Sequence, residues 1–170
     1  MQYISRSNEE TNKIAKDFLE TIYPIGFSSV VVALQGELGA GKTAFAQEVG
    51  KILGVTENMH SPTFVIMKAY RLQPTTHNKQ PTTQNLKNSE SGSKLSVVGR
   101  WSTLIHIDAY RLEKESELLH LGWEEITKEP ENLILIEWPE NVAGIIPTNA
   151  KRISFKFIDE NTREIEIHEN

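Results

Sequence analysis

Gly36-Glu37-Leu38-Gly39-Ala40-Gly41-Lys42-Thr43 is the stretch that decides the fold of this chain, and it fits the phosphate-binding pattern G-x-x-x-x-G-K-[ST]. A β-branched apolar run of strand length, residues 30–35, precedes it. Residues 44–53 follow it with apolar side chains at helical spacing, and Gly54 stands where a helix C-cap belongs. The motif therefore lies between a strand and a helix, which is the context that a phosphate-binding loop (P-loop) requires.

The residues of this motif have distinct predicted roles. Its glycines let the backbone curl so that successive N–H groups point at phosphate oxygens, and the following helix adds its positive N-terminal end. Lys42 is predicted to reach the β- and γ-phosphates, and Thr43 to offer its hydroxyl to Mg²⁺. The predicted nucleotide-binding residues are Gly36, Glu37, Leu38, Gly39, Ala40, Gly41, Lys42, Thr43 and Ala44.

The composition of the chain fits a single P-loop domain over residues 1–170, with 38% hydrophobic residues to build a core. There is no cysteine, which leaves no disulfide framework, no thiolate metal site and no cysteine nucleophile. The N-terminus lacks the apolar core of a signal peptide and no apolar run reaches membrane-spanning length, so we expect a cytoplasmic protein with no membrane partner. A net charge of −5 argues against a stand-alone nucleic-acid binder, because binding to a phosphate backbone favours a basic surface.

A helix is predicted between the N-terminus and the P-loop strand. Ser7 and Glu10 fit a capping box, and Pro24 and Gly26 are expected to end the helix. A plain packing role is the simplest interpretation of this segment, but a helix just before the P-loop strand can lie near the base of a nucleotide. Thr11, which we expect to be exposed early in this helix, is therefore a candidate base contact.

Ser61-Pro62-Thr63-Phe64 leads from the P-loop helix into a strand predicted over residues 65–72. Pro62 biases the residue before it toward extended backbone. A threonine on such a loop can swing toward Mg²⁺ and the γ-phosphate, as switch loops do. The alternative for Thr63 is an ordinary connecting loop.

Residues 73–100 differ in kind from the rest of the chain. They are rich in Thr, Gln, Asn, Ser and Lys, and their only aliphatic residues are Leu86, Leu95, Val97 and Val98. This composition predicts a long polar surface insertion, partly or wholly disordered. This segment has four basic residues and one Glu, which gives it a charge of +3. Because the net charge of the whole chain is −5, the other residues together carry −8. We favour a tolerated loop; a basic arm for an acidic partner or RNA is the alternative.

Two predicted strands end in carboxylates. Residues 133–136 are consecutive aliphatics, which suits a strand buried on both faces of a parallel sheet, and Glu137 follows them. An acid at that place is the Walker B arrangement, at the sheet edge where α/β proteins bind ligands. Asp108 ends a similar strand, so the sequence offers two acids for one metal. We assign the metal to Thr43 and Glu137, and Asp108 to orienting the attacking water or a metal-bound water.

The remaining segments complete an α/β fold. Residues 113–121 predict a short helix that Gly122 stops, and alternation on both sides of a turn at residues 159–161 predicts a C-terminal antiparallel hairpin with one solvated face. Arg152, at the start of this hairpin, is either near the nucleotide or a solvated strand arginine. The predicted fold is a three-layer α/β P-loop NTPase with a mostly parallel central sheet, some antiparallel strands and the hairpin.

The five histidines show no metal-ligand spacing. His106 lies two residues before Asp108, which is too little for a zinc site. We interpret it as a packed strand histidine.

Four stretches together resemble the TsaE family, the bacterial P-loop ATPases of tRNA threonylcarbamoyladenosine biosynthesis. They are the P-loop motif, Ser61-Pro62-Thr63-Phe64, His106-Ile107-Asp108-Ala109-Tyr110-Arg111-Leu112 and Ile136-Glu137-Trp138-Pro139-Glu140. Many ATPases and GTPases share the first, whereas the other three, in this order and in so short a chain, are specific. The resemblance runs from the first helix to the final hairpin, except for residues 73–100.

This resemblance implies binding of ATP with Mg²⁺, slow intrinsic hydrolysis and service to two partner proteins. Those partners are the TsaD- and TsaB-type subunits of the threonylcarbamoyl transferase that modifies adenosine 37 of tRNAs, so tRNA itself is expected to be an indirect partner. The candidate catalytic residues are Asp108, Lys42 and Thr63, and Thr43 and Glu137 are the implied metal ligands. The residues that the resemblance places at the nucleotide are Thr11, Trp138, Glu140 and Arg152.

Three other functions are compatible with a P-loop. A small-molecule kinase usually carries an arginine-bearing lid over the phosphates, and the insertion offers only Arg100. A GTPase switch usually recognises guanine with Asn-Lys-x-Asp, but the two Asn-Lys pairs continue as Ile14-Ala15 and Gln80-Pro81. A nucleotide-binding structural subunit without turnover remains the third alternative.

Overall fold

A computed structural model of the protein describes residues 1–24, 27–72, 97 and 99–169. In those ranges seven strands form one sheet, in the order β1-β7-β6-β2-β5-β4-β3. The strands are β1 (Gln2–Ser5), β2 (Val30–Gly36), β3 (Met67–Arg71), β4 (Thr103–Asp108), β5 (Asn132–Glu137), β6 (Lys151–Phe157) and β7 (Arg163–Ile167). The helices are α1 (Asn8–Thr21), α2 (Lys42–Ile52), α3 (Glu115–His120), α4 (Trp123–Lys128) and the 3-10 helix η1 (Pro139–Ile145). None of these helices is both long and apolar enough to cross a bilayer.

The centre of the sheet is parallel and its edges are antiparallel. β2 pairs in parallel with both β5 and β6, and β5 pairs in parallel with β4. Antiparallel pairings add β3 beside β4, and β7 between β6 and β1. β5 is buried along its whole length, as its aliphatic run predicts. The predicted α/β P-loop architecture is confirmed.

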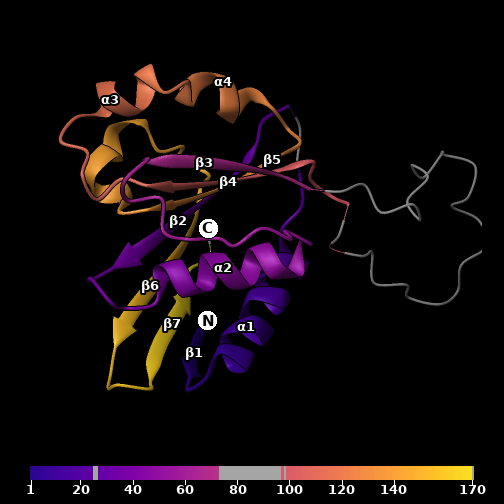
Figure 1. Ribbon diagram of the computed structural model, residues 1–170, viewed down its shortest axis with the longest axis vertical. Coiled ribbons are helices and arrows are strands. Elements are labelled where there is room, and N and C mark those ends of the chain that lie inside the picture. The colour runs from indigo at the N-terminus through magenta and orange to yellow at the C-terminus, as the bar shows by residue number, and fades with distance from the viewer. Residues whose placement is uncertain (25–26, 73–96, 98, 170) are drawn as a thin grey trace, which may run out of the picture.

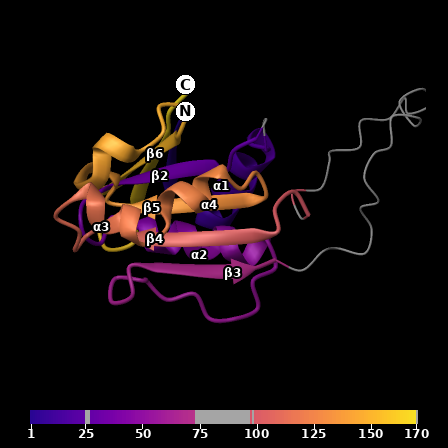
Figure 2. The same ribbon diagram turned by 90° about the horizontal axis from the view of Figure 1, so that it is seen from above.

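Helices cover both faces of this sheet, which gives three layers (Figures 1 and 2). Because side chains alternate along a strand, Val32 and Leu34 of β2 pack with α1 and α2, whereas Val31 and Ala33 pack with α3, α4 and η1. The P-loop sits at the carboxyl end of β2, where it joins β2 to α2.

Helix α1 begins as its capping sequence predicts, with one difference. The Ser7 hydroxyl accepts the Glu10 N–H at 3.3 Å, but the Glu10 carboxylate accepts the N–H of Arg6 at 2.6 Å instead of that of Ser7. The helix ends at Thr21, before Pro24. The apolar face of α1 packs against α2 and the sheet.

Three elements differ from the prediction. The strand expected over residues 65–72 begins only at Met67, because Ile66 has φ +64° and breaks the extended backbone. The helix expected over residues 113–121 is α3, and Gly122 at φ +85° starts a second helix, α4, that we did not predict. β1 was also not predicted, because it is only 4 residues long and is stabilised by pairing with β7 at the other end of the chain.

The insertion was predicted over residues 73–100, and its last described residues pack against the core. Val97 is buried in the core beneath α1 and α2, and Arg100 Nη1 donates to the carbonyls of Leu19 and Ile22 at 2.8 and 2.6 Å. These contacts join the segment to the C-terminal end of α1. Composition could not predict them, because the two segments are far apart in sequence. Residues 73–96 and 98 lie outside the described residues, so the prediction for them stays a prediction.

Candidate functional site

A cavity of about 610 Å³ opens at the carboxyl ends of the parallel strands, which is a usual size for a small-molecule site. Its wall combines residues 38–44 of the P-loop and α2 with the start of α1, the loop after α2 and the C-terminal hairpin. The residues that line it from the other elements are Ser5, Arg6, Ser7, Asn8, Thr11, Ser61, Thr63, Asp108, Tyr110, Glu137, Trp138, Phe155, Glu160, Asn161, Arg163 and Ile165. Segments far apart in sequence thus converge on the predicted phosphate site.

The P-loop backbone depends on two of its glycines. A Cβ on Gly36 would lie 2.3 Å from the carbonyl oxygen of Phe155, its register partner on β6, so no side chain fits there. Gly41 has φ +106°, a conformation that other residues rarely adopt, and it precedes the first residue of α2. Among the described residues, no side chain caps this end of α2. Its first N–H groups therefore remain available for an anion.

Lys42 is buried at the centre of the site. Its Nζ donates to the carbonyls of Gly36 at 2.6 Å and Glu37 at 2.9 Å, so these two residues hold the lysine. Neither Gly36 nor Glu37 lines the cavity. The ammonium also lies 3.9 Å from the centroid of the Trp138 ring. Burial lowers the pKa of Lys42 from its ordinary value, and the negative charges of Glu137, Glu140 and Asp108 oppose that shift. The two carbonyls therefore hold the ammonium at the P-loop, and the neighbouring acids favour its charged form.

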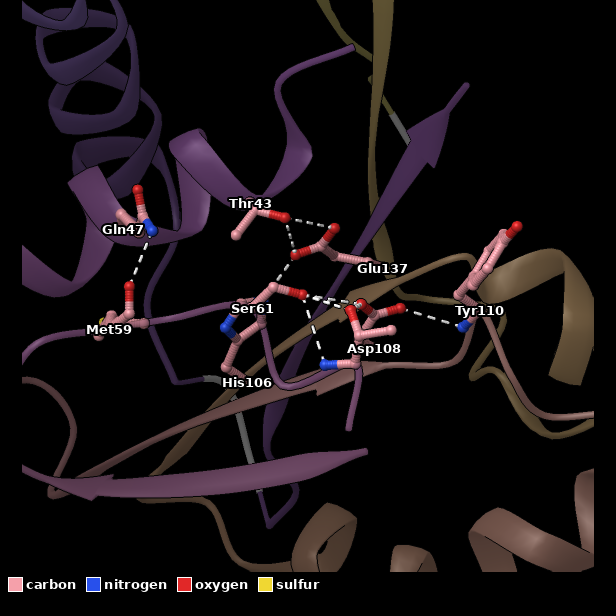
Figure 3. Close-up of polar contacts among 9 residues, drawn as sticks. Thr43, Gln47, Met59, Ser61, His106, Asp108, Tyr110 and Glu137 are labelled. Atoms are coloured by element: carbon pink, nitrogen blue, oxygen red, sulfur yellow. Dashed lines mark hydrogen bonds and ion pairs between the residues drawn. The ribbon is translucent and has the colours of Figure 1, made fainter. Parts of the chain in front are cut away.

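Thr43 and Glu137 meet at the base of the cavity (Figure 3). The Thr43 hydroxyl donates to both Glu137 carboxylate oxygens, at 2.9 and 3.0 Å. His106 Nε2 lies 2.8 Å from Oε1 of the same carboxylate. A hydroxyl beside a carboxylate is a suitable ligand pair for Mg²⁺, which prefers oxygen ligands and takes the rest of its shell from phosphates and water. The described residues contain no cluster of three or more His, Asp or Glu that could hold a metal, so this pair is what the protein would supply.

Asp108 holds the loop that follows α2. Its Oδ2 accepts from the hydroxyls of Ser61, at 3.0 Å, and Thr63, and its Oδ1 accepts the Tyr110 N–H at 3.0 Å (Figure 3). The Asp108 N–H donates to the carbonyl of Ile66 at 2.8 Å. Asp108 and Glu137 are register partners on neighbouring strands. The two acids therefore share the sheet edge but hold different segments: Glu137 the start of α2, and Asp108 the loop that carries Thr63.

The position of Thr11 differs from the prediction. We expected an exposed side chain, but Thr11 is buried, because its hydroxyl pairs with that of Ser5 at 2.7 Å. It still lines the cavity. Trp138 also lines it, in a left-handed backbone conformation with φ +58°, and its ring lies 5.0 Å from that of Tyr110.

Arg152 and Glu140 do not line the cavity. Arg152 is opposite Ala33 in the β2–β6 register, three residues before Phe155 at the sheet edge, which places it about 10 Å back along the strand. Glu140 is exposed on η1 and affects the site through its charge near Lys42.

Arg163 reaches the P-loop from β7 instead. Its Nε donates to the Gly39 carbonyl at 3.2 Å, and its guanidinium stacks on Phe157 at 4.5 Å. Phe157 is half-exposed near the end of β6, whereas Ile153 and Phe155 of the same strand are buried.

His106, Ser61 and Arg163 are among the residues at or beside this site that sequence reasoning missed. His106 was interpreted as packing only, although period-two alternation already places it on the same strand face as Asp108. Ser61 was considered only as the residue before Pro62. Arg163 had no local signal, because its position depends on how β7 returns along β6.

Comparison with known proteins identifies the family of this chain. The family described as Threonylcarbamoyl adenosine biosynthesis protein TsaE matches residues 5–80 and 84–165. The chain is 32% identical over 168 residues to a tRNA threonylcarbamoyladenosine biosynthesis protein TsaE from Rickettsia felis, covering 98% of this chain and 79% of the relative. A protein of the same name from Bacillus subtilis is 31% identical over 159 residues, covering 92% of this chain and 78% of the relative.

A solved structure is also similar. The crystal structure of YdiB from Bacillus subtilis superimposes with a TM-score of 0.65 at 25% identity, covering 98% of this chain and 83% of that one. The matches span both the P-loop half and the hairpin half of the sheet. This chain belongs to the TsaE family.

Proposed function

We propose that this protein binds ATP with Mg²⁺, hydrolyses it slowly, and thereby supports the threonylcarbamoyl transferase of tRNA N6-threonylcarbamoyladenosine biosynthesis. The observation that carries the proposal is the contact of the Thr43 hydroxyl with the Glu137 carboxylate at the foot of the P-loop. It joins the two side chains that the P-loop and Walker B patterns assign to one metal, across 94 residues of sequence. The relatives named for this biosynthesis support the pathway.

In this proposal the chain's own residues hold a nucleotide in three ways, and two further residues act on its γ-phosphate. The N–H groups of residues 38–44 and the N-terminus of α2 bind phosphate oxygens. Lys42 adds a charge, and Thr43 with Glu137 holds the metal. Mg²⁺, when bound, neutralises charge on the phosphate oxygens. Asp108 orients the water, and Thr63 lies on the loop that responds to the γ-phosphate.

The loop after α2 also supports a role for a protein partner. Phe64 is 84% exposed and Val65 63% exposed, directly after Thr63 at the cavity. Arg111 stacks on the Phe64 ring at 4.5 Å. Exposed apolar side chains beside a nucleotide site favour a contact whose strength depends on the nucleotide. We propose TsaD- and TsaB-type transferase subunits as the partners, tRNA as an indirect partner through them, and the cytoplasm as the place of this reaction.

The experiment measures ATP turnover by the purified chain alone and with the two transferase subunits. Slow turnover alone, faster turnover with the transferase, and tighter binding in the ATP state than in the ADP state are expected. Mass spectrometry of tRNA nucleosides from cells without this protein should show loss of the modified adenosine. The proposal would be contradicted if the transferase did not change ATP turnover and if cells without this protein kept the modified adenosine. The chain would then be a P-loop protein with a different function.

A further inference from the structure

His106 is a polar side chain on an otherwise apolar stretch of β4. The residue two before it on the same face, Leu104, belongs to the core beneath α1 and α2, and the His106 ring is 0% exposed. A buried imidazole costs free energy unless its nitrogens find partners. The contacts of this ring therefore indicate what it contributes.

In the part of the chain that the structure describes, one of the two ring nitrogens has a partner and the other does not. Nε2 lies 2.8 Å from Glu137 Oε1, while Nδ1 has none among the described residues. His106 is opposite Leu135 in the β4–β5 register, so Glu137 is its diagonal neighbour on the same sheet face. Because the carboxylate only accepts, we assign the hydrogen of this bond to Nε2. An apolar side chain would fill the same place without leaving a buried nitrogen unpaired, so the bond to Glu137 is the contribution that packing alone does not require.

We infer that His106 is a positioning residue of the Mg²⁺ site, which orients the Glu137 carboxylate toward Thr43. The inference rests on the proposed function. Glu137 receives two donors from different layers: Thr43 from α2, and His106 from β4. The bond from β4 keeps Oε1 in place whatever the Thr43 hydroxyl does. Side chains that hold a metal ligand in this way tune metal affinity without touching the metal.

The test compares two substitutions of His106 in the full chain. His106→Leu fills the site but cannot donate, whereas His106→Gln carries an amide N–H that can replace Nε2–H. The measurements are the affinity for ATP in EDTA, and the affinity for Mg²⁺ in saturating ATP. We expect the Leu variant to lose about 10- to 100-fold in Mg²⁺ affinity with its ATP affinity in EDTA unchanged, and the Gln variant to regain most of that loss.

Ile107→Val is the control, because Ile107 packs in the core on the other face of the same strand. A Leu variant with wild-type Mg²⁺ affinity would overturn the inference. The inference would also be overturned if the Leu and Gln variants lost affinity equally, both in EDTA and in Mg²⁺. That result would indicate that His106 contributes only by packing. Absence of Mg²⁺-dependent ATP binding in the wild-type chain would instead contradict the proposed function.

Nuclear magnetic resonance of the imidazole nitrogens gives a readout that needs no nucleotide. We expect a slowly exchanging Nε2–H on His106 that disappears in Glu137→Ala. An Nδ1–H tautomer in the wild-type chain would overturn the assignment of the bond, and with it the inference.

Discussion

The two acids at the sheet edge differ in what they hold, and this difference can be tested at the scale of single residues. Glu137 accepts from Thr43 at the P-loop, whereas Asp108 accepts from the loop of Ser61 and Thr63. Glu137→Ala should therefore weaken Mg²⁺-dependent ATP binding. Asp108→Asn should leave binding intact and lower kcat by about 10²- to 10⁴-fold, the usual loss of a group that assists proton transfer. Titration and single-turnover kinetics separate these effects; if the Asp108 variant loses the metal dependence instead, the two roles must be exchanged.

Lys42 carries the P-loop charge closest to the predicted phosphates. Charge-assisted hydrogen bonds contribute about 1.5–3 kcal/mol, so Lys42→Ala should weaken ATP binding by roughly 10- to 150-fold. Lys51→Ala at the other end of α2 is the control, because this side chain is 63% exposed and pairs only with Glu48 among the described contacts. Calorimetric titration with ATP and GTP measures the loss. Equal affinity in the wild type and the Lys42 variant, or a strong preference for GTP, would contradict the assignment.

Arg163 and Arg152 offer a test between two predictions of which arginine contacts the nucleotide. The cavity geometry favours Arg163, whereas the family resemblance implies Arg152. Arg163 donates to the P-loop carbonyl of Gly39, whereas Arg152 lies away from the cavity lining. Loss of one such bond costs about 1 kcal/mol, so Arg163→Ala should weaken ATP binding about fivefold. Arg152→Ala should leave it unchanged in the same titration. The reverse result would mean that the nucleotide extends along β6 beyond the cavity.

At the scale of elements, Arg100 links the end of the insertion to α1. Helix α1 has no basic residue in its last turn, and Arg100 supplies one by donating to the carbonyls of Leu19 and Ile22. Arg100→Ala should lower the free energy of unfolding by about 1.5–3 kcal/mol, the range for hydrogen bonds to charged groups. For a domain of this size that loss lowers Tm by roughly 3–12 °C.

Calorimetry or circular dichroism measures this Tm, with the exposed Arg71 on β3 as the control. Arg71→Ala, at the other end of the insertion, should change stability by about 0.5 kcal/mol or less. Both variants should bind ATP like the wild type. If Arg100→Ala leaves Tm unchanged, the contact with α1 does not stabilise the fold.

At the scale of the whole molecule, the proposed partner contact can be separated from nucleotide binding. Phe64 is exposed beside the cavity but does not line it. Phe64→Ser should leave ATP binding and basal hydrolysis unchanged and weaken binding to the transferase by about fivefold or more, the loss typical of an aromatic contact residue. Phe27→Ser is the matched control, because Phe27 is 95% exposed and precedes β2, at the opposite edge of the sheet. Equal stimulation of hydrolysis in wild type and Phe64→Ser would exclude this loop from the interface.

The sequence alone determined the elements that are specified by the pattern of residues within one segment of the chain. The P-loop between β2 and α2, the fully buried β5 and the acids that end β4 and β5 were all predictable, because spacing along one element sets which side chains share a face. α4 and β1 escaped prediction, because each is short and β1 is stabilised by pairing with the distant β7.

The tertiary structure alone decided which distant groups meet. The bond from His106 to Glu137 depends on β4 pairing with β5, and the reach of Arg163 to Gly39 spans 124 residues and depends on the return of β7 along β6. The burial of Thr11 likewise depends on Ser5, which β1 places beside α1. Such contacts follow from strand order and register, which are set by the packing of the whole sheet. The spacing of residues along the sequence therefore cannot predict them.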